Sequence, residues 1–217
     1  MKILVLCGDA WHPPEVARRG LEAIARNQFT FDWIEDARHW TPEAMAAYPL
    51  VVLTKSDNVS VTDNSSWMTD TVQAAFSEYV RRGNGLLAIH SGTAEYEHKP
   101  VIRDLLGGVF LRHPEQCPVT VNPRPGHPLC AGSAPFTVMD EHYFMALDDT
   151  EADVFMTIRS VNGEQPGAWR REVGDGRVAV LTPGHNIEVW QHPSYQALVF
   201  NSLRWCGRME AASQVRR

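Results

Sequence analysis

Three short segments of this sequence place reactive side chains directly after an apolar run. They are Gly8-Asp9-Ala10-Trp11-His12, His90-Ser91-Gly92-Thr93 and Thr182-Pro183-Gly184-His185. Imidazole titrates near neutral pH and also binds transition metals, so these segments suit acid–base catalysis or metal binding. Because ligands bind at the carboxyl ends of parallel strands, we expect the three segments to meet at one edge of a sheet.

The catalytic candidates are two histidines and one glutamate. His90 ends an apolar run abruptly, a pattern typical of the strand–turn–helix elbow that lifts a reactive side chain above a sheet. His185 follows a glycine at the second strand end, and Glu141 lies in a polar cluster where it could orient a histidine. The same three residues, His90, Glu141 and His185, are the predicted ligands if a divalent metal such as zinc is bound, although their scattered spacing identifies no metal. The alternative for each histidine is a purely structural hydrogen bond.

Seven further residues are predicted to contact the substrate or to orient the groups that do. Aromatic rings beside polar groups suit the apolar faces of sugars. Proline restricts the residue before it to an extended conformation, which fixes the direction of a histidine that precedes one. The set is Asp9, Trp11, His12, Ser91, His113, Tyr143 and Trp190. The remaining histidines with surface or packing character are His39, His98, His142 and His192.

The elements that must position these residues alternate in type along the first half of the chain. Short apolar runs predict buried strands at 2–7, 50–53 and 85–89, and the alternation of apolar and polar residues predicts a further strand at 29–34. Amphipathic segments between them predict helices at 15–27 and 67–82, with another beginning at Thr41-Pro42-Glu43. This alternation predicts a parallel sheet with helices on both faces. The polar stretch 55–66 is long for a connection and predicts a mobile loop or lid.

The pattern changes after a short predicted helix at 100–106. Short β-like pieces alternate with turns rich in proline and glycine, and predict a short antiparallel extension packed on the sheet. These pieces occur at 119–121, 136–139 and 154–158. A buried strand is predicted again at 177–181, and a closing helix at 194–206.

Composition and charge limit the classes of function. The chain has 217 residues, 44% of them hydrophobic, with 20 Lys and Arg against 26 Asp and Glu, a net charge of −6. This balance disfavours both nucleic acid and anionic membranes as partners. No apolar run approaches the ~20 residues of a transmembrane helix, and the first residues lack a signal-peptide core. We therefore expect a cytoplasmic protein, with a single domain over 1–210 and a C-terminal tail at 211–217.

Several familiar motifs are missing. The sequence has no Gly-x-Gly-x-x-Gly after the first strand, no phosphate-binding Gly-Lys-Ser/Thr loop and no His-Glu-x-x-His. The four cysteines form no Cys-x-x-Cys pair and are expected to be reduced. A cysteine hydrolase using Cys7 is a weak alternative, because this residue ends a buried strand.

An ordered set of motifs along nearly the whole chain resembles the ThuA-like (trehalose utilisation) family. The motifs are Gly8-Asp9-Ala10-Trp11-His12-Pro13, Gly83-Asn84-Gly85-Leu86-Leu87-Ala88-Ile89-His90-Ser91, Leu106-Gly107-Gly108 with His113-Pro114, Asp140-Glu141-x-Tyr143, Gly176-Arg177-Val178, and Gly184-His185 with Trp190 and Trp205. The resemblance implies a flavodoxin-like three-layer α/β/α sandwich similar to class I glutamine amidotransferases. It also implies that the nucleophilic cysteine of those enzymes is absent, since His90 stands at the elbow.

The resemblance further implies a role in bacterial metabolism of trehalose, related disaccharides and their 3-keto derivatives. We therefore predict an enzyme that eliminates, hydrolyses or isomerises a disaccharide or 3-keto-sugar at a His/Glu site, with or without a divalent metal. A keto group acidifies the neighbouring C–H bond, so a histidine and carboxylate could drive such chemistry, and a metal could polarise the carbonyl. The alternative is a non-catalytic sugar-binding or regulatory domain. A homodimer is the default expectation for such a protein.

Overall fold

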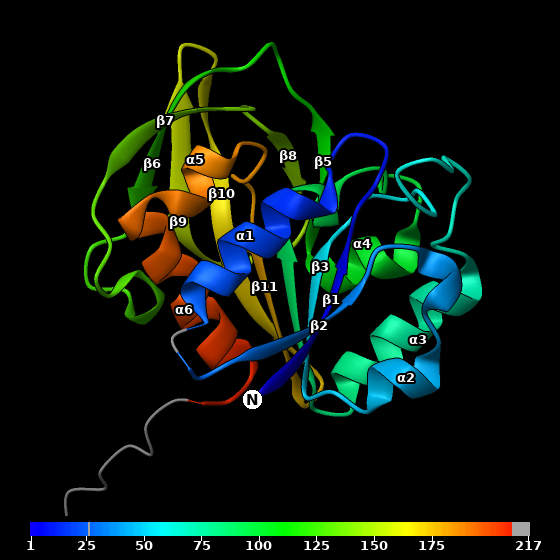
Figure 1. Ribbon diagram of the computed structural model, residues 1–217. Helices are drawn as coiled ribbons and strands as arrows, with labels where there is room; N and C mark the ends of the chain where they lie inside the picture. Colours follow the sequence, from blue (N-terminus) through cyan, green and yellow to red (C-terminus); the bar gives the residue numbers. More distant parts are fainter. Residues whose placement is uncertain (26, 210–217) are drawn as a thin grey trace, which may run out of the picture.

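The centre of the fold is a nine-stranded mixed sheet with helices on both faces (Figure 1). A computed structural model describes residues 1–25 and 27–209, so the predicted tail at 211–217 lies outside the described residues. The strand order is β2-β1-β3-β4-β11-β10-β9-β6-β7. The α/β fold expected from the alternation of apolar runs and amphipathic segments is thus confirmed.

The first five strands in this order are parallel to one another. Along β1, Ile3 and Val5 face one hydrophobic core while Leu4 and Leu6 face the other. Strands buried on both faces are apolar throughout, which explains why the runs at 2–7, 50–53 and 85–89 could be recognised in the sequence. The edge strand Thr30–Ile34 is mostly half-buried and contains Asp32. The parallel strands are β1 (Lys2–Cys7), β2 (Thr30–Ile34), β3 (Leu50–Thr54), β4 (Gly85–Ile89) and β11 (Gly176–Leu181).

The antiparallel part is larger than the short extension predicted. It continues the same sheet with four strands, because β10 pairs with β11 and then with β9, and β6 links β9 to β7. The strands are β6 (Cys117–Pro123), β7 (Phe136–Asp140), β9 (Asp153–Ser160) and β10 (Gly163–Val173). A separate two-stranded sheet joins β5 (Gly108–Arg112) to β8 (Phe144–Leu147).

Two groups of helices cover the two faces of the sheet (Figure 1). One face carries α1 (Pro14–Ile24), α5 (Ile187–Gln191) and α6 (Pro193–Cys206). The other carries α2 (Pro42–Ala46), α3 (Asp70–Arg81) and α4 (Pro100–Leu106). Single-turn 3-10 helices are η1 (Ala37–His39), η2 (His90–Thr93) and η3 (Pro128–Cys130). Thr41 caps α2 by accepting a hydrogen bond from the amide of Ala44 at 3.1 Å.

The stretch 55–66, predicted as a mobile loop or lid, is anchored to the body of the protein. Lys55 is fully buried, and its ammonium donates to the carbonyl of Glu35 at 3.2 Å. The carboxylate of Asp57 accepts a hydrogen bond from the amide of Trp67 at 3.0 Å. Buried polar groups need partners, and these bonds supply them. The first half of the stretch is therefore a packed connection.

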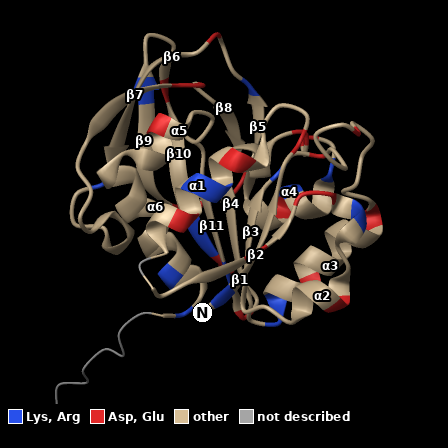
Figure 2. Ribbon diagram, in the orientation of Figure 1, with Lys and Arg blue, Asp and Glu red and all other residues tan. Residues whose placement is uncertain are grey.

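Charged residues of both signs are interspersed along the elements in the orientation of Figure 2. Among the described residues, no helix combines the length and apolar character that crossing a membrane requires.

Candidate functional site

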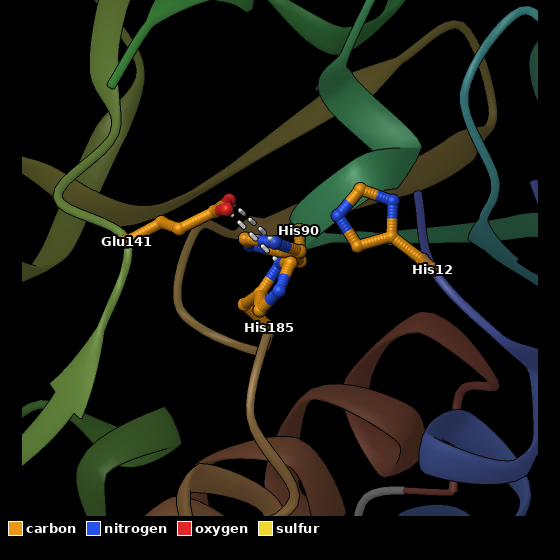
Figure 3. A group of neighbouring side chains, drawn as sticks. All are labelled: His12, His90, Glu141 and His185. Carbon is orange, nitrogen blue, oxygen red and sulfur yellow. Dashed lines mark ion pairs between the residues drawn. The ribbon is translucent and has the colours of Figure 1, made fainter. Parts of the chain in front are cut away.

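The loops that follow β1, β4 and β11 bring three histidines together, as the sequence predicts. The ring centroids of His12 and His90 lie 4.9 Å apart, those of His12 and His185 5.1 Å, and those of His90 and His185 5.5 Å. Glu141, which follows β7, completes the group from the opposite side to His12 (Figure 3). Four segments that are far apart in the sequence thus share one site.

His90 occupies the predicted elbow. Its φ of 50° lies in the left-handed region, which a residue with a side chain enters only under constraint. Its Nδ1 is 2.9 Å from the carbonyl oxygen of Thr182. Because a carbonyl only accepts, Nδ1 carries the proton and Nε2 presents a lone pair, 3.0 Å from the hydroxyl of Tyr143. Burial lowers the pKa of His90, which keeps the ring neutral.

The close approach of Gly184 makes room for this elbow. A Cβ at position 184 would lie 3.2 Å from the Cβ of His90, and φ there is 146°. Both the space and the backbone conformation favour glycine at this point of the β11 loop.

His12 is oriented by Asp9. Its Nδ1 lies 2.7 Å from the Oδ1 of Asp9, which also accepts the amides of Trp11 and His12 at 3.0 Å each. Burial alone would raise the pKa of Asp9, but the hydrogen bond and charge of His12 outweigh it and lower the pKa to about 2. The carboxylate accepts a hydrogen bond from the Nδ1–H of His12, so the neutral form of this ring has its lone pair on Nε2.

Of the two roles predicted for Asp9, contact with the substrate and orientation of a neighbouring group, this geometry favours the second. The side chain of Asp9 has no exposed surface, and its other oxygen accepts the amide of Ser56 at 3.0 Å. Asp9 can act on a bound molecule only through His12.

Glu141 lies between two of the histidines. Its Oε1 is 3.2 Å from Nδ1 of His185, and its Oε2 is 3.4 Å from Nε2 of His90. The first contact is close enough for an ion pair but is not aligned as a hydrogen bond. Burial would raise the pKa of Glu141, but the histidines outweigh it and hold this pKa well below its usual range. Since burial keeps His90 neutral, the charged pair is Glu141 with His185, whose pKa the carboxylate raises.

Asp140 belongs to the site, although the sequence did not single it out for a role. Its carboxylate is fully buried and accepts the amides of Gly184 at 2.9 Å and His185 at 3.1 Å. Burial raises the pKa of Asp140. A carboxylate that binds main-chain amides has no characteristic residue spacing. The position of Asp140 next to Glu141 is therefore the one signal in the sequence that could have identified it as a site residue.

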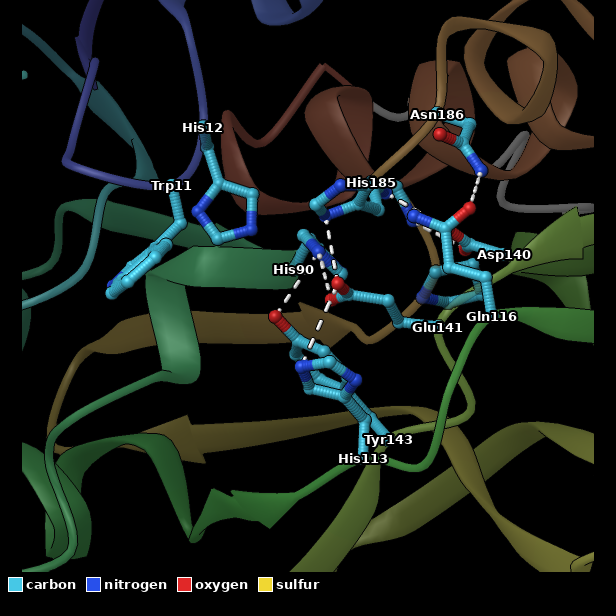
Figure 4. Close-up of polar contacts among 12 residues, drawn as sticks. Trp11, His12, His90, His113, Gln116, Asp140, Glu141, Tyr143, His185 and Asn186 are labelled. Carbon is cyan, nitrogen blue, oxygen red and sulfur yellow. Dashed lines mark hydrogen bonds and ion pairs between the residues drawn. The ribbon is translucent and has the colours of Figure 1, made fainter.

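The other predicted contact residues divide into buried and accessible ones. Tyr143 and His113 lie on the same side of Glu141 (Figure 4). Tyr143 is 2% exposed, and its ring stacks on His90 with the centroids 4.2 Å apart. In this structure Tyr143 therefore contacts His90 and presents little surface to a substrate. Ser91 is fully buried, and its hydroxyl finds no hydrogen-bond partner among the described residues. His113 is more open, with Nε2 3.5 Å from Oε1 of Glu141.

The two tryptophans predicted to stack on a sugar differ sharply. Trp190 is 1% exposed, and its Nε1 donates to the carbonyl of Gly184 at 2.8 Å. Its indole packs against α1 in the core and has no open face for a sugar, so that prediction is wrong. Trp11 is 68% exposed and stands beside His12 (Figure 4).

A small cavity of about 20 Å³ lies beneath the histidines, with His12, Ser91 and His185 among its lining residues. Cys7 also lines it, but burial raises the pKa of this thiol to about 12. The thiol stays protonated at neutral pH, which argues against the cysteine hydrolase alternative.

The mixed sheet and the polar cluster at the carboxyl ends of its parallel strands define an α/β protein with a candidate ligand site at a strand-end edge. The chain belongs to the ThuA family, described as trehalose utilisation, whose model matches residues 2–206. No curated protein matches the chain.

Solved structures of similar fold agree with this assignment. A protein described as ThuA-like from Parabacteroides merdae ATCC 43184 has a TM-score of 0.78 and 20% identity, covering 99% of this chain and 92% of its own. A cytoplasmic protein from Salmonella typhimurium has a TM-score of 0.68 and 17% identity, covering 95% and 99%. A cold-adapted β-galactosidase from Rahnella sp. R3 has a TM-score of 0.67 and 14% identity, covering 95% of this chain but 31% of its own. At these identities the likeness shows the fold alone.

Proposed function

We propose that this protein is an enzyme of carbohydrate metabolism that acts on a disaccharide or its 3-keto derivative. Membership of the ThuA family supports the link to carbohydrates. The observation that carries catalysis is the convergence of His12, His90, Glu141 and His185, with donor atoms within 4.8 Å of one another. Clusters of titratable groups with shifted pKa values are typical of active sites.

The chemistry that suits these groups is elimination next to a ketone. In a 3-keto-glycoside, the carbonyl acidifies the C–H bond at C2. A base takes this proton, and the electron pair of the C–H bond forms an enediolate with the carbonyl. The enediolate then expels the glycosidic oxygen at C1, which takes a proton from an acid. Proton transfers of this kind are what imidazole and carboxylate groups perform near neutral pH.

The exposed fractions of the candidate side chains indicate different roles for them. The side chains of His185 and His113 are 24% and 38% exposed, so a sugar can reach them. His90 is 1% exposed, so a sugar cannot reach it, and its contacts are with protein side chains such as Tyr143 and Glu141. We therefore assign proton transfer to His185 and His113, with Glu141 as their shared carboxylate.

Trp11 is the group that best suits sugar binding. Its ring is 68% exposed, while its main-chain amide is held by Asp9 at 3.0 Å. A large rigid ring fixed beside polar groups can stack on the apolar face of a pyranose.

We also propose that the fold belongs to the flavodoxin-like class of the glutamine amidotransferase superfamily. The order β2-β1-β3-β4-β11 of the parallel strands supports this, since it matches the flavodoxin-like order. A cytoplasmic location and a homodimer stay predictions.

The test is turnover of defined sugars by the purified protein. Trehalose and 3-keto-trehalose are incubated with the wild type and with His185→Ala, and glucose release is followed by chromatography. We expect release from 3-keto-trehalose, with trehalose unchanged because it has no ketone, and a loss on the order of 100-fold in the variant. The exposed His98→Ala serves as the matched control and should keep full activity. Binding of either sugar without turnover would instead favour the non-catalytic sugar-binding alternative.

A further inference from the structure

We propose that His12, His90, Glu141 and His185 bind one divalent transition-metal ion of the zinc type. This goes beyond the sugar chemistry above, because the site can bind an ion in the absence of any sugar. It also extends the three ligands predicted from the sequence by a fourth, His12.

The hydrogen bonds of two of the rings favour a metal. Nδ1 of His90 donates to the carbonyl of Thr182, and Nδ1 of His12 donates to the carboxylate of Asp9. The neutral form of each ring therefore has its lone pair on Nε2, and neutral imidazole is the form of histidine that ligates metals. A histidine that ligates a metal commonly donates its other ring N–H to a carboxylate or carbonyl, as these two do.

The arrangement of the rings also suits one central ion. The three imidazoles are mutually close to perpendicular, with interplanar angles of 83°, 77° and 74°. One donor atom from each of the four residues lies within 4.8 Å of the others. Zinc ligands at about 2.0–2.2 Å from the ion are about 3.4 Å apart, so closure needs movements of roughly 1 Å or less.

Unpartnered polar atoms provide an independent argument. Nε2 of His12 is buried and has no hydrogen-bond partner among the described residues. Buried polar atoms are normally satisfied, and a cation would satisfy this nitrogen. The hydroxyl of Ser91 is unpartnered in the same way and lines the same cavity of about 20 Å³. That volume admits about one water molecule, which Ser91 could hold next to the ion.

The charge of the surroundings points the same way. Three carboxylates are buried around the rings, with exposures of 1% for Asp9, 0% for Asp140 and 8% for Glu141. Buried charges need compensation. Lys55 is a fully buried cation whose ammonium donates to main-chain carbonyls. A dication among the imidazoles would compensate the carboxylates directly.

The donor set selects the class of metal. Imidazole nitrogen with one carboxylate oxygen suits Zn²⁺, Co²⁺, Ni²⁺ or Fe²⁺. Mg²⁺ and Ca²⁺ prefer all-oxygen sites and should not compete. A bound ion would polarise the carbonyl of a keto-sugar. With the ion bound, His185 would be a ligand, and the proton transfer assigned to it above would pass to His113, whose Nε2 lies 3.5 Å from Oε1 of Glu141.

The experiment measures metal binding without any sugar. The full chain is freed of metal with a chelator and titrated with Zn²⁺ by calorimetry and with Co²⁺ by visible absorption. We expect one ion per chain and a Co²⁺ absorption spectrum typical of four- or five-coordinate cobalt. Excess Mg²⁺ should not displace Zn²⁺ or Co²⁺ from the site. Replacement His12→Ala should weaken binding on the order of 100-fold, whereas the exposed His98→Ala should bind as the wild type does.

Several results would overturn the proposal. These are the absence of Zn²⁺ and Co²⁺ binding by the folded wild type, unchanged affinity in His12→Ala, and an equal loss in His98→Ala. Circular dichroism checks the fold of each variant, and Glu141→Gln replaces His12→Ala if that variant does not fold. A protein that binds one Zn²⁺ but turns over no sugar would overturn the proposed function and leave the metal site standing.

Discussion

Asp140 sets the position of His185 through the main chain, because its Oδ1 accepts the amide of His185 at 3.1 Å. Its Oδ2 accepts the amide of the preceding Gly184 at 2.9 Å. Asp140 ends β7 at the far edge of the antiparallel strands, whereas His185 follows the parallel strand β11. The loop that carries the histidine is therefore held by a residue from the other part of the sheet.

Replacement Asp140→Asn tests this link. The new amide group would point N–H donors at a main-chain N–H, so the loop must shift and His185 with it. We expect sugar turnover and Co²⁺ affinity to fall by about tenfold or more, with circular dichroism showing a folded protein. The exposed Glu164→Gln is the control and should change neither value. Wild-type turnover and affinity in Asp140→Asn would contradict the positioning role.

Replacement Trp11→Ala tests the stacking surface. Because Trp11 is 68% exposed, its removal should leave the thermal stability close to that of the wild type. The expected result is a KM for 3-keto-trehalose raised about tenfold, with kcat within about twofold, since stacking binds ground state and transition state alike. Val161→Ala, at a side chain that is 94% exposed, provides the comparison. A fall in kcat at constant KM would show that Trp11 acts in some other way.

Replacement Gly20→Ala tests the packing of α1 on Trp190. A Cβ at position 20 would come within 2.4 Å of Cε3 of Trp190, so either the helix or the indole must move. We expect the free energy of unfolding in urea to fall by about 1–3 kcal/mol. The exposed Glu22→Ala in the same helix should stay within about 0.5 kcal/mol of the wild type. Equal stability of the two variants would argue against tight packing at this point.

Asp153 predicts a dependence of stability on pH. Burial would raise its pKa, but hydrogen bonds from Arg170, Arg124 and His127 outweigh burial and hold this pKa well below its usual range. A carboxylate whose pKa is lower in the folded state stabilises the fold above its unfolded pKa of about 3.9. This contribution is lost as the pH falls through the folded value.

Replacement Asp153→Asn measures that contribution. The variant should have a lower Tm than the wild type at about pH 7, and the difference should shrink as the pH falls below about 4. The exposed Asp175→Asn is the matched control, with little change in Tm expected at about pH 7. A Tm difference for Asp153→Asn that grows toward acid pH would contradict the assignment.

Much of the parallel part of the fold could be predicted because β1, β3, β4 and β11 are buried on both faces and read as largely apolar runs. Strand β10 could not. It contains Pro166 and Gly167, which are typical of turns, and its register with β9 shifts between Pro166 and Ala168. A bulge of this kind breaks the alternation that identifies an antiparallel strand.

The candidate site could be predicted in part for a similar reason. His90 directly follows the apolar strand β4, and His185 lies in the turn after the apolar strand β11. The positions of these strand ends in the sequence were therefore enough to predict that the two histidines are neighbours. Trp190 looked like a loop residue because α5 spans only Ile187–Gln191 and shows little periodicity. The role of Asp140 depends on main-chain amides 44 and 45 residues away, which no local pattern encodes.

The four clustered side chains follow β1, β4, β7 and β11, which span the chain from its first strand to its last. No fragment that ends before β11 can assemble the centre, however well its own strands pair. An ion could therefore gain all four ligands only after the final strand has joined the sheet. Conversely, a bound ion would tie both halves of the chain together and should slow unfolding of the whole sheet at once.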